Sequence, residues 1–377
     1  MSLTVDREVL AGALDKADLV ARTEKLEGEP VCGVNISENK MVLVSDGLGI
    51  RVKMELPVES DENIQVVIPI SKVNGLVKLF TAKVVVMDFE EREENKTLLI
   101  KGDKSSYRIR CNKVDVPIPF LYGDVVTTIK SSEFLSALSG VSYASSDRNI
   151  SKPQLSCVYI GIDNTLIVFL GGDGYRASRC VLSLDDDCGI KDYFLVPKSY
   201  IPVLSRLMGE GEVEIISSSK EEMGIKSGNT DVIMSVFAYE YPSNGISSIM
   251  DSLDGVIYCE LETQHLINAV NRLSLVSSSQ SPVTKITFLE NSLMFSAESG
   301  DYGEGKEEVA SVFSGNISRK SESVILGIMR IKDALAGIKQ DKIRLAFGDR
   351  KSLIIPSCDK SERLVFDHFM VPIYGEQ

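Results

Sequence analysis

Six segments with helical periodicity recur along the chain at a nearly constant interval, and this recurrence restricts the fold more than any other feature. Each segment carries apolar residues at helical spacing, as Val9, Leu10 and Leu14 do in the first. The predicted helices are Asp6–Leu26, Pro69–Phe80, Ser131–Ser145, Pro197–Leu207, Glu262–Val276 and Met329–Ile338. Corresponding helices start about 125–132 residues apart, which is in the size range of one domain.

Short alternating or apolar runs, separated by turn-forming sequences, fill the intervals between these helices. In the first third the predicted strands are Val31–Ile36, Met41–Ser45, Gly49–Leu56, Val84–Phe89, Thr97–Lys101 and Ser106–Cys111. The pattern predicts an α+β fold of three similar domains, each with two helices packed on antiparallel sheet, at residues 1–125, 126–251 and 252–377. Three unrelated domains of similar size are the alternative, which the repeated spacing disfavours.

Composition and cysteine usage favour a reduced, cytoplasmic protein. No apolar run approaches the roughly 20 residues that a membrane span needs, and the N-terminal sequence does not have the pattern of a signal peptide. The 7 cysteines are dispersed and form no C-x-x-C pair, which is typical of small core residues rather than of a disulfide framework.

The most informative stretch, residues 141–179, reads VSYASSDRNISKPQLSCVYIGIDNTLIVFLGGDGYRASR. Alternation in Cys157–Ile162 predicts a strand, and the following DNT sequence is typical of a turn. The apolar run Leu166–Leu170 predicts a second strand that is buried on both faces. The GGDG sequence after it ends this strand, and the strand pattern resumes at Tyr175.

This stretch resembles the second domain of the bacterial DNA polymerase III beta subunit, the DNA sliding clamp family. The family carries VSYA-S-D, Pro-x-L-x-G-V and ATDGYRLA patterns, and the sequences here are VSYASSD (141–147), KPQLSCV (152–158) and GGDGYRAS (171–178). Further matches follow in the family's order at VPK (196–198), YP (241–242) and MVPI (370–373). Together the matches span nearly the whole chain.

The resemblance implies a sliding clamp, a head-to-tail homodimer whose six domains form a ring around duplex DNA. Such a ring tethers the replicative polymerase as a processivity factor and also binds the clamp loader and repair proteins through short linear motifs. It has no catalytic activity, cofactor or metal. The alternatives are a clamp-derived scaffold that no longer loads on DNA, and an enzyme that uses Asp173 or the Asp185–Asp187 run.

The net charge of −13 argues against an ordinary DNA-binding surface, which neutralises phosphates with a basic face. A ring that encircles DNA is held by topology, so a mildly basic inner face is enough. The resemblance implies that the helices line the hole, and Lys198 is the most direct match. The candidate DNA-facing residues are Arg22, Lys25, Lys72, Lys78, Arg148, Lys152, Lys198, Arg206, Arg272, Arg330 and Lys332. A solvated surface of mixed charge is the alternative for any single one of them.

The family also has a hydrophobic pocket, between its second and third domains, that receives the partner's motif. The matching residues are Leu155, Gly172, Gly174, Tyr175, Arg176, Ala177, Pro242, Ile246, Ser247, Ser352, Met370, Val371, Pro372 and Ile373. Gly172 stands where the family has Thr, Ala177 where it has Leu and Val371 where it has Met. We expect these smaller side chains to widen the pocket and to alter its preference for the family's Gln-Leu-x-Leu-Phe type of motif. An ordinary interdomain core is the alternative.

The family's subunit contact joins the first domain of one copy to the third domain of the other. The matching residues are Tyr107 and Ile109 on a predicted strand, with Leu275 and Val276 at a helix end. Pairing of two edge strands would remove an aggregation hazard from both. A self-contained edge is the alternative.

No catalytic constellation is evident in the sequence. Its 2 histidines, His265 and His368, are far apart, and neither is expected to have a serine, aspartate or cysteine partner in a recognisable arrangement. The Asp185–Asp187 run lacks the ligand spacing of a metal-binding loop and is interpreted as a solvated turn. There is no Walker motif, so no ATPase is expected.

Overall fold

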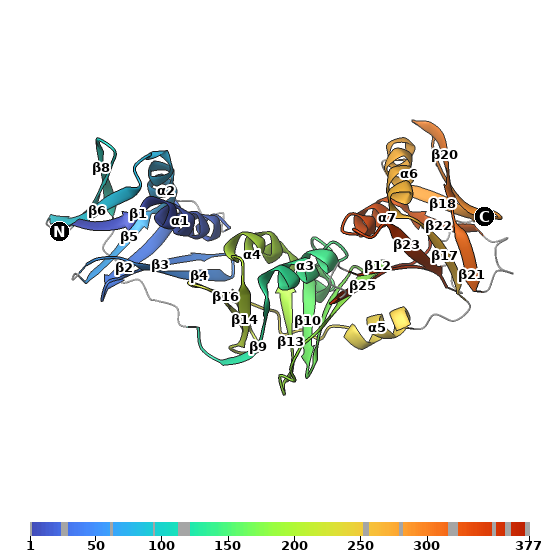
Figure 1. Ribbon diagram of the computed structural model, residues 1–377, viewed down its shortest axis with the longest axis horizontal. Helices are drawn as coiled ribbons and strands as arrows, with labels where there is room; N and C mark the ends of the chain where they lie inside the picture. Colours follow the sequence, from blue (N-terminus) through green and yellow to red (C-terminus); the bar gives the residue numbers. More distant parts are fainter. Residues whose placement is uncertain are drawn as a thin grey trace. The chain divides into compact units, whose positions relative to one another are not determined.

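The computed structural model describes residues 2–23, 29–60, 63–92, 95–111, 121–251, 256–278, 282–315, 323–348, 352–358 and 363–373 (Figure 1). Two compact units divide the chain. Unit 1 contains residues 1–132 and 199–237, and unit 2 contains residues 133–198 and 238–377. Each unit therefore takes in part of the middle third, and the division at 125 and 251 into three domains stays a prediction.

All six predicted helices are present, although their ends differ from the predicted ones. They are α1 (Arg7–Ala21), α2 (Ile70–Leu79), α3 (Ser131–Ser142), α4 (Ile201–Leu207), α6 (Thr263–Val276) and α7 (Ile328–Leu335). Asp6 caps α1, because its side chain accepts hydrogen bonds from the backbone N–H groups of Glu8 and Val9. Among the described residues no helix is long and apolar enough to cross a membrane.

A further helix, α5 (Ser243–Asp251), was not predicted from the sequence. Its SNGISS start is poor in helix-forming residues, and Met250 is its only buried side chain.

Unit 1 contains two antiparallel sheets. The larger has the strand order β5-β2-β3-β4-β16-β15-β14-β9, and the smaller has the order β1-β6-β7-β8. The strands of the larger sheet are β2 (Val31–Ser37), β3 (Lys40–Gly47), β4 (Ile50–Pro57), β5 (Ile64–Pro69), β9 (Asp124–Lys130), β14 (Glu212–Ser217), β15 (Glu222–Ser227) and β16 (Thr230–Ser235). Those of the smaller sheet are β1 (Ser2–Asp6), β6 (Val84–Arg92), β7 (Asn95–Gly102) and β8 (Ser105–Cys111). The six strands predicted in the first third are confirmed.

Unit 2 also contains two antiparallel sheets, with the orders β13-β10-β11-β12-β25-β24-β23-β17-β21 and β20-β19-β18-β22. The strands from the middle third are β10 (Cys157–Asp163), β11 (Leu166–Gly172), β12 (Arg176–Ser183) and β13 (Lys191–Pro197). Those from the last third are β17 (Ile257–Glu262), β18 (Val283–Phe288), β19 (Ser292–Ser299), β20 (Gly303–Ala310), β21 (Val312–Gly315), β22 (Ser323–Gly327), β23 (Lys342–Phe347), β24 (Leu353–Cys358) and β25 (Leu364–Met370). The strand–turn–strand prediction for Cys157–Leu170 is confirmed.

Pairs of helices cover the sheets as the amphipathic pattern predicted. In unit 1, α1 packs against both α2 and β3, and in unit 2, α6 packs against both α7 and β19 (Figure 1). Leu14 in α1 and Phe295 in β19 are almost completely buried. Burial of one such side chain contributes roughly 1.5–3 kcal/mol, so these faces stabilise both units.

Gly171 lies where β11 runs close to the end of α3. A Cβ atom at Gly171 would lie 2.3 Å from the backbone oxygen of Val141, whereas one at Gly172 would meet its nearest neighbour, the oxygen of Arg176, at 3.4 Å. Real Cβ atoms do not approach backbone as closely as the first distance. Gly171 is therefore required by the packing of the helix on the strand, and Gly172 is not.

We expect Gly171→Ala to lower the free energy of unfolding by about 1–3 kcal/mol, because the backbone of α3 must move to admit the methyl group. Gly172→Ala is the matched control, and we expect it to change stability by less than about 0.5 kcal/mol. Urea denaturation of the two variants measures both values. Equal losses would contradict the close approach at Gly171.

Candidate functional site

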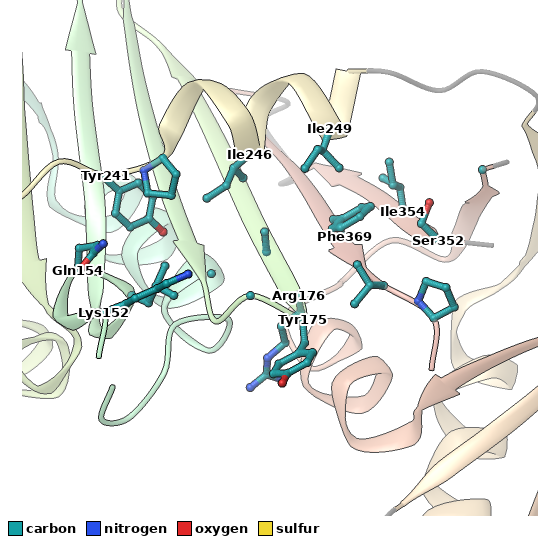
Figure 2. Close-up of a pocket in the computed structure, with 18 of the residues that line it drawn as sticks. Lys152, Gln154, Tyr175, Arg176, Tyr241, Ile246, Ile249, Ser352, Ile354 and Phe369 are labelled. Carbon is teal, nitrogen blue, oxygen red and sulfur yellow. The ribbon is translucent and has the colours of Figure 1, made fainter. Parts of the chain in front are cut away.

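A pocket of about 1090 Å³ lies in unit 2 among the β11–β12 turn, α5, β24 and the end of β25 (Figure 2). Most of the predicted pocket residues line it. They are Leu155, Gly172, Gly174, Tyr175, Arg176, Ala177, Pro242, Ile246, Ser352, Val371 and Pro372. Residues that are up to 217 positions apart in the sequence, Leu155 and Pro372, thus surround one cavity.

Three predicted pocket residues do not contribute to its lining. Ser247 is half-buried on α5, and Met370 is buried within the hydrophobic core of unit 2. The backbone N–H of Ile373 donates to the oxygen of Ile325 at 2.8 Å, which ties the segment after β25 to β22.

Several lining residues were missed by the sequence analysis. They are Gln154, Glu240, Tyr241, Ile249, Gly348, Ile354 and Phe369, together with Lys152, which was assigned to the DNA-facing set. Ile249 was missed because α5 was not predicted. The three-residue spacing of Ile246 and Ile249, followed by buried Met250, is a helical signal that could have revealed this wall.

The rim of the pocket is a turn held by Asp173. Its carboxylate accepts hydrogen bonds from the backbone N–H groups of Tyr175 and Arg176 at 2.9 and 3.0 Å. Gly174 has a φ of +93°, a conformation that L-residues with a Cβ rarely adopt. The GGDG sequence therefore forms a tight, side-chain-supported corner between β11 and β12.

Arg176 fixes this corner to α7. Its guanidinium donates to Asp173 at 3.1 Å and to Asp333 at 2.7 Å. Burial works against the charged form, but the hydrogen bond that Arg176 donates to Asp333 and the negative charge of Asp173 raise the pKa of Arg176. The arginine thus stays ionised and holds the rim in one position.

Tyr175 extends the rim toward solvent. Its backbone oxygen accepts from the N–H of Val371 at 3.0 Å, and the guanidinium of Arg330 lies 4.9 Å from the centre of its ring. This stacking is a cation–π contact. Arg330, one of the predicted DNA-facing residues, therefore belongs to the surroundings of the pocket.

Tyr241 lines one end of the pocket and is the first ring of a stack of three tyrosines. The rings of Tyr241 and Tyr159 are 5.3 Å apart at 21°, and those of Tyr159 and Tyr193 are 5.6 Å apart at 23°. Tyr241 packs in a small core cluster with Cys157 and Leu170. This end of the pocket can take up an apolar or aromatic group, and the polar rim can orient the chain that carries it.

Half of the predicted DNA-facing cations that can be located are paired with carboxylates. Their shortest distances are 2.9 Å for Arg22–Asp18, 3.0 Å for Lys72–Glu29, 2.7 Å for Lys198–Asp147 and 2.6 Å for Arg272–Glu307, and Lys78 pairs with Asp15. The hydrogen bond from Lys198 lowers the pKa of Asp147, and that from Arg272 lowers the pKa of Glu307. Local pairing therefore weakens the positive field of these helices.

The other candidates differ in their surroundings. Arg148, Lys152 and Arg206 are exposed, and Lys332 is half-buried on α7. Lys25 lies outside the described residues. The positive surface is thus made of a few exposed side chains and several paired ones.

Two sheet edges carry opposite charge. Strand β8, at one edge of its sheet, carries Arg108 and Arg110, and its Tyr107 is exposed while Ile109 is half-buried. Strand β20, at the edge of the other four-stranded sheet, carries three glutamates and one lysine. Near it, Leu275 is 77% exposed at the end of α6, whereas Val276 packs against the core.

The expectation that neither histidine has a serine partner is wrong for His368. Its Nδ1 lies 2.9 Å from Ser178 Oγ and 3.0 Å from the hydroxyl of Tyr143. His368 is 4% exposed and Ser178 is 0% exposed, so no substrate can reach the pair. The sequence could not show this contact because β12 and β25 are about 190 residues apart. His265 is exposed on α6.

The acidic run Asp185–Asp187 is exposed, as expected for a solvated turn, and Asp185 pairs with Arg363 at 3.2 Å. Within the described ranges, no group of three or more His, Cys, Asp or Glu side chains is arranged to hold a metal ion. The carboxylate of Asp173, the other residue named for a possible enzyme, accepts hydrogen bonds within the rim of the pocket.

Known proteins resemble the last third of this chain in sequence and the whole chain in structure. Residues 255–367 match the family described as DNA polymerase III beta subunit, C-terminal domain. The beta sliding clamp of Chlamydia muridarum is 22% identical over 218 residues, which are 57% of this chain and 58% of that protein. The matched region therefore spans less than two thirds of the length of this curated relative.

Solved structures extend the likeness over the whole chain. The DNA polymerase sliding clamp from Pseudomonas aeruginosa has a TM-score of 0.85 at 18% identity, with 100% of both chains covered. The beta subunit from the DNA polymerase of Streptococcus pyogenes has a TM-score of 0.87 at 16% identity, also with full coverage. The resemblance to the DNA polymerase III beta subunit family is confirmed. The chain has the sliding clamp fold from end to end.

We expect the stability of the chain to fall as the pH is lowered from 6.5 to 5. Burial lowers the pKa of His368 to about 4 in the folded protein, so the unfolded chain binds more protons over this range. The expected loss from pH 6.5 to 5 is about 1–2 kcal/mol, and it should vanish in His368→Gln. Urea denaturation at several pH values above the range of carboxylate titration measures the slope. An unchanged slope in the variant would show that His368 is not its source.

Proposed function

We propose that the chain is a DNA sliding clamp, a ring that encircles duplex DNA and tethers the replicative polymerase and other replication and repair proteins. The match of the whole chain to solved sliding clamps carries the proposal. The clamp would be built of three domains per chain, at residues 1–125, 126–251 and 252–377. It would act in the cytoplasm as a non-catalytic accessory subunit, without a cofactor or metal.

Weak, sequence-independent contacts with phosphates suit a ring that must slide. The exposed Arg148 and Arg206 would attract the DNA backbone, while pairs such as Arg272–Glu307 reduce the field of the other helices. Topology rather than affinity would hold the ring in place. Tethering then raises the effective concentration of the polymerase at the primer end, so that a polymerase that dissociates rebinds quickly.

The pocket in unit 2 would bind short linear motifs of the polymerase, the clamp loader and repair proteins. Its apolar end suits an anchor side chain, and the rim formed by Tyr175 and Arg176 would contact the backbone or polar groups of the motif. The rim is fixed by Asp173 and Asp333, so little ordering of the pocket would be needed on binding.

Ring closure would pair β8 of one copy with β20 of another. The two arginines of β8 and the three glutamates of β20 have complementary charges, which favours this pairing over β8 with β8 or β20 with β20. Tyr107 and Leu275 are exposed next to these edges and would be covered by the contact. Two such contacts per dimer would cover the edge strands β8 and β20 of each chain.

An interaction scaffold that no longer loads on DNA is the second candidate. The pairing of Arg22, Lys72, Lys78, Lys198 and Arg272 with carboxylates favours it, because a chain of net charge −13 whose helix cations are paired in this way attracts DNA weakly. The scaffold would keep the pocket and the fold but not the topological link to DNA.

Retention on circular DNA distinguishes a clamp from a scaffold. With the clamp loader of its own host and ATP, we expect the chain to co-elute with a nicked circular plasmid on gel filtration and to be released when the plasmid is linearised. Raising the salt after loading should release little protein, because a topological link does not depend on counterions. Equal binding to linear and circular DNA would contradict encirclement, and no retention on either would favour the scaffold.

A further inference from the structure

Helix α5 forms one wall of the pocket without being packed deeply into unit 2. Met250 is its only buried residue, and Ile249 is 50% exposed. Figure 2 shows Ile246 and Ile249 on the side of α5 that faces the other lining side chains, among them Phe369. A helix of 9 residues is too short to be stable by itself, so α5 depends on contacts near its two ends.

Backbone and apolar contacts hold the first turn of α5. The N–H of Ser243 donates to the oxygen of Tyr241 at 2.8 Å, and the N–H of Ile246 donates to the oxygen of Pro242 at 3.0 Å. The side chain of Ile246 packs against the hydrophobic cluster that contains Tyr241. This end of the wall is therefore fixed to the strands of the middle third.

An arginine outside the pocket lining holds the last residue of α5. The guanidinium of Arg179, on β12, lies 2.8 Å from the carboxylate of Asp251 and 2.7 Å from that of Asp367. Burial works against the charged form of Arg179, but its hydrogen bonds to Asp367 and Asp251 raise its pKa, so it stays ionised. Because Arg179 and Asp367 are opposite each other in the β12–β25 ladder, the ion pair with Asp251 links α5 to that ladder.

The dipole of α5 does not explain a carboxylate at this position. The C-terminal end of a helix carries a partial negative charge, so an aspartate there destabilises the helix unless a cation compensates it. Arg179 is such a cation. The favourable contact of Asp251 is thus a tertiary one, between the helix and the sheet.

The ion pair acts on the part of the wall that Ile249 forms, because Asp251 is only two residues further along the helix. Ile249 lines the pocket together with Ile354 and Phe369, which are cross-strand neighbours on β24 and β25. If this part of the wall were free to move, it would have to be ordered again whenever a ligand binds. Such ordering reduces affinity.

We propose that Arg179 is a positioning residue for ligand binding, which holds α5 in place through Asp251 and thereby sets the affinity of the pocket for the apolar anchor of a partner motif. The inference rests on the proposed function of the pocket as a docking site for short motifs. Neither Arg179 nor Asp251 is among the described lining residues, so their effect on a ligand passes through the position of α5. The pair of Arg179 with Asp367 stays intact when Asp251 is changed.

Fluorescence anisotropy of a labelled peptide, Gln-Leu-Ser-Leu-Phe, with the full chain tests the inference. We expect Asp251→Ala to bind it about fivefold more weakly, because the charge-assisted contact with Arg179 is lost. Asp251→Glu keeps the carboxylate and should retain most of the affinity. Asp163→Ala is the matched control and should bind like the unsubstituted chain, since Asp163 pairs with Lys191 at 2.9 Å on β10, outside the described pocket lining.

Hydrogen exchange of the free chains separates the hold on α5 from the stability of the helix itself. Alanine favours a helix more than aspartate does, and it removes a negative charge from the C-terminal end of the dipole. Helix stability alone therefore predicts slower exchange of the α5 amides in Asp251→Ala. Loss of the contact with Arg179 predicts exchange about threefold faster at the C-terminal end of α5.

The outcomes separate the inference from the proposed function. If Asp251→Ala binds the peptide as tightly as the unsubstituted chain does, and exchange in α5 is not faster, the inference is overturned and the docking pocket stands. Weaker binding with slower exchange would mean that Asp251 acts on the peptide directly, which also overturns the inference. If the peptide does not bind the unsubstituted chain, the docking role fails, and exchange in α5 alone decides whether Arg179 positions the helix.

Discussion

Strands β12 and β25 pair in antiparallel register from Arg176 opposite Met370 to Leu182 opposite Leu364. This ladder joins the strands of the middle third to those of the last third in one sheet. It also places the β11–β12 corner beside the segment that follows β25. The backbone N–H of Val371 in that segment donates to the backbone oxygen of Tyr175 in the corner. Without this pairing there would be no pocket, because its two sides come from parts of the chain that are far apart in sequence.

Polar contacts secure the ladder at one end and in its middle. At the end Arg176 bridges Asp173 and Asp333, and midway along the same strand Arg179 bridges Asp251 and Asp367. The second arginine reaches the C-terminal residue of α5, the helix that forms a wall of the pocket. Partly buried arginines with two carboxylates each hold one geometry better than single surface pairs do. The pocket is therefore formed before any ligand arrives.

Six helices and many of the strands could be predicted from the sequence, because the amphipathic period is a local signal. The pairing of the strands could not be predicted, since nothing local in β12 indicates that it pairs with β25 rather than with another strand. Most pocket residues were found only through the resemblance to the clamp family. Ile249 was missed because it lies on a helix with one buried side chain, and Tyr241 because it packs on strands that are distant in sequence. The contact of His368 with Ser178 depends on the β12–β25 register.

The charges of the molecule fit a ring better than a surface that grips DNA. The chain is strongly acidic, its helix cations are often paired, and the two sheet edges of opposite charge offer a way for copies to join head to tail. Light scattering coupled to size exclusion and small-angle X-ray scattering tests this account most directly. The account predicts a hollow particle of twice the chain mass of 41.3 kDa. A compact or elongated particle of one chain mass at micromolar concentration would contradict it.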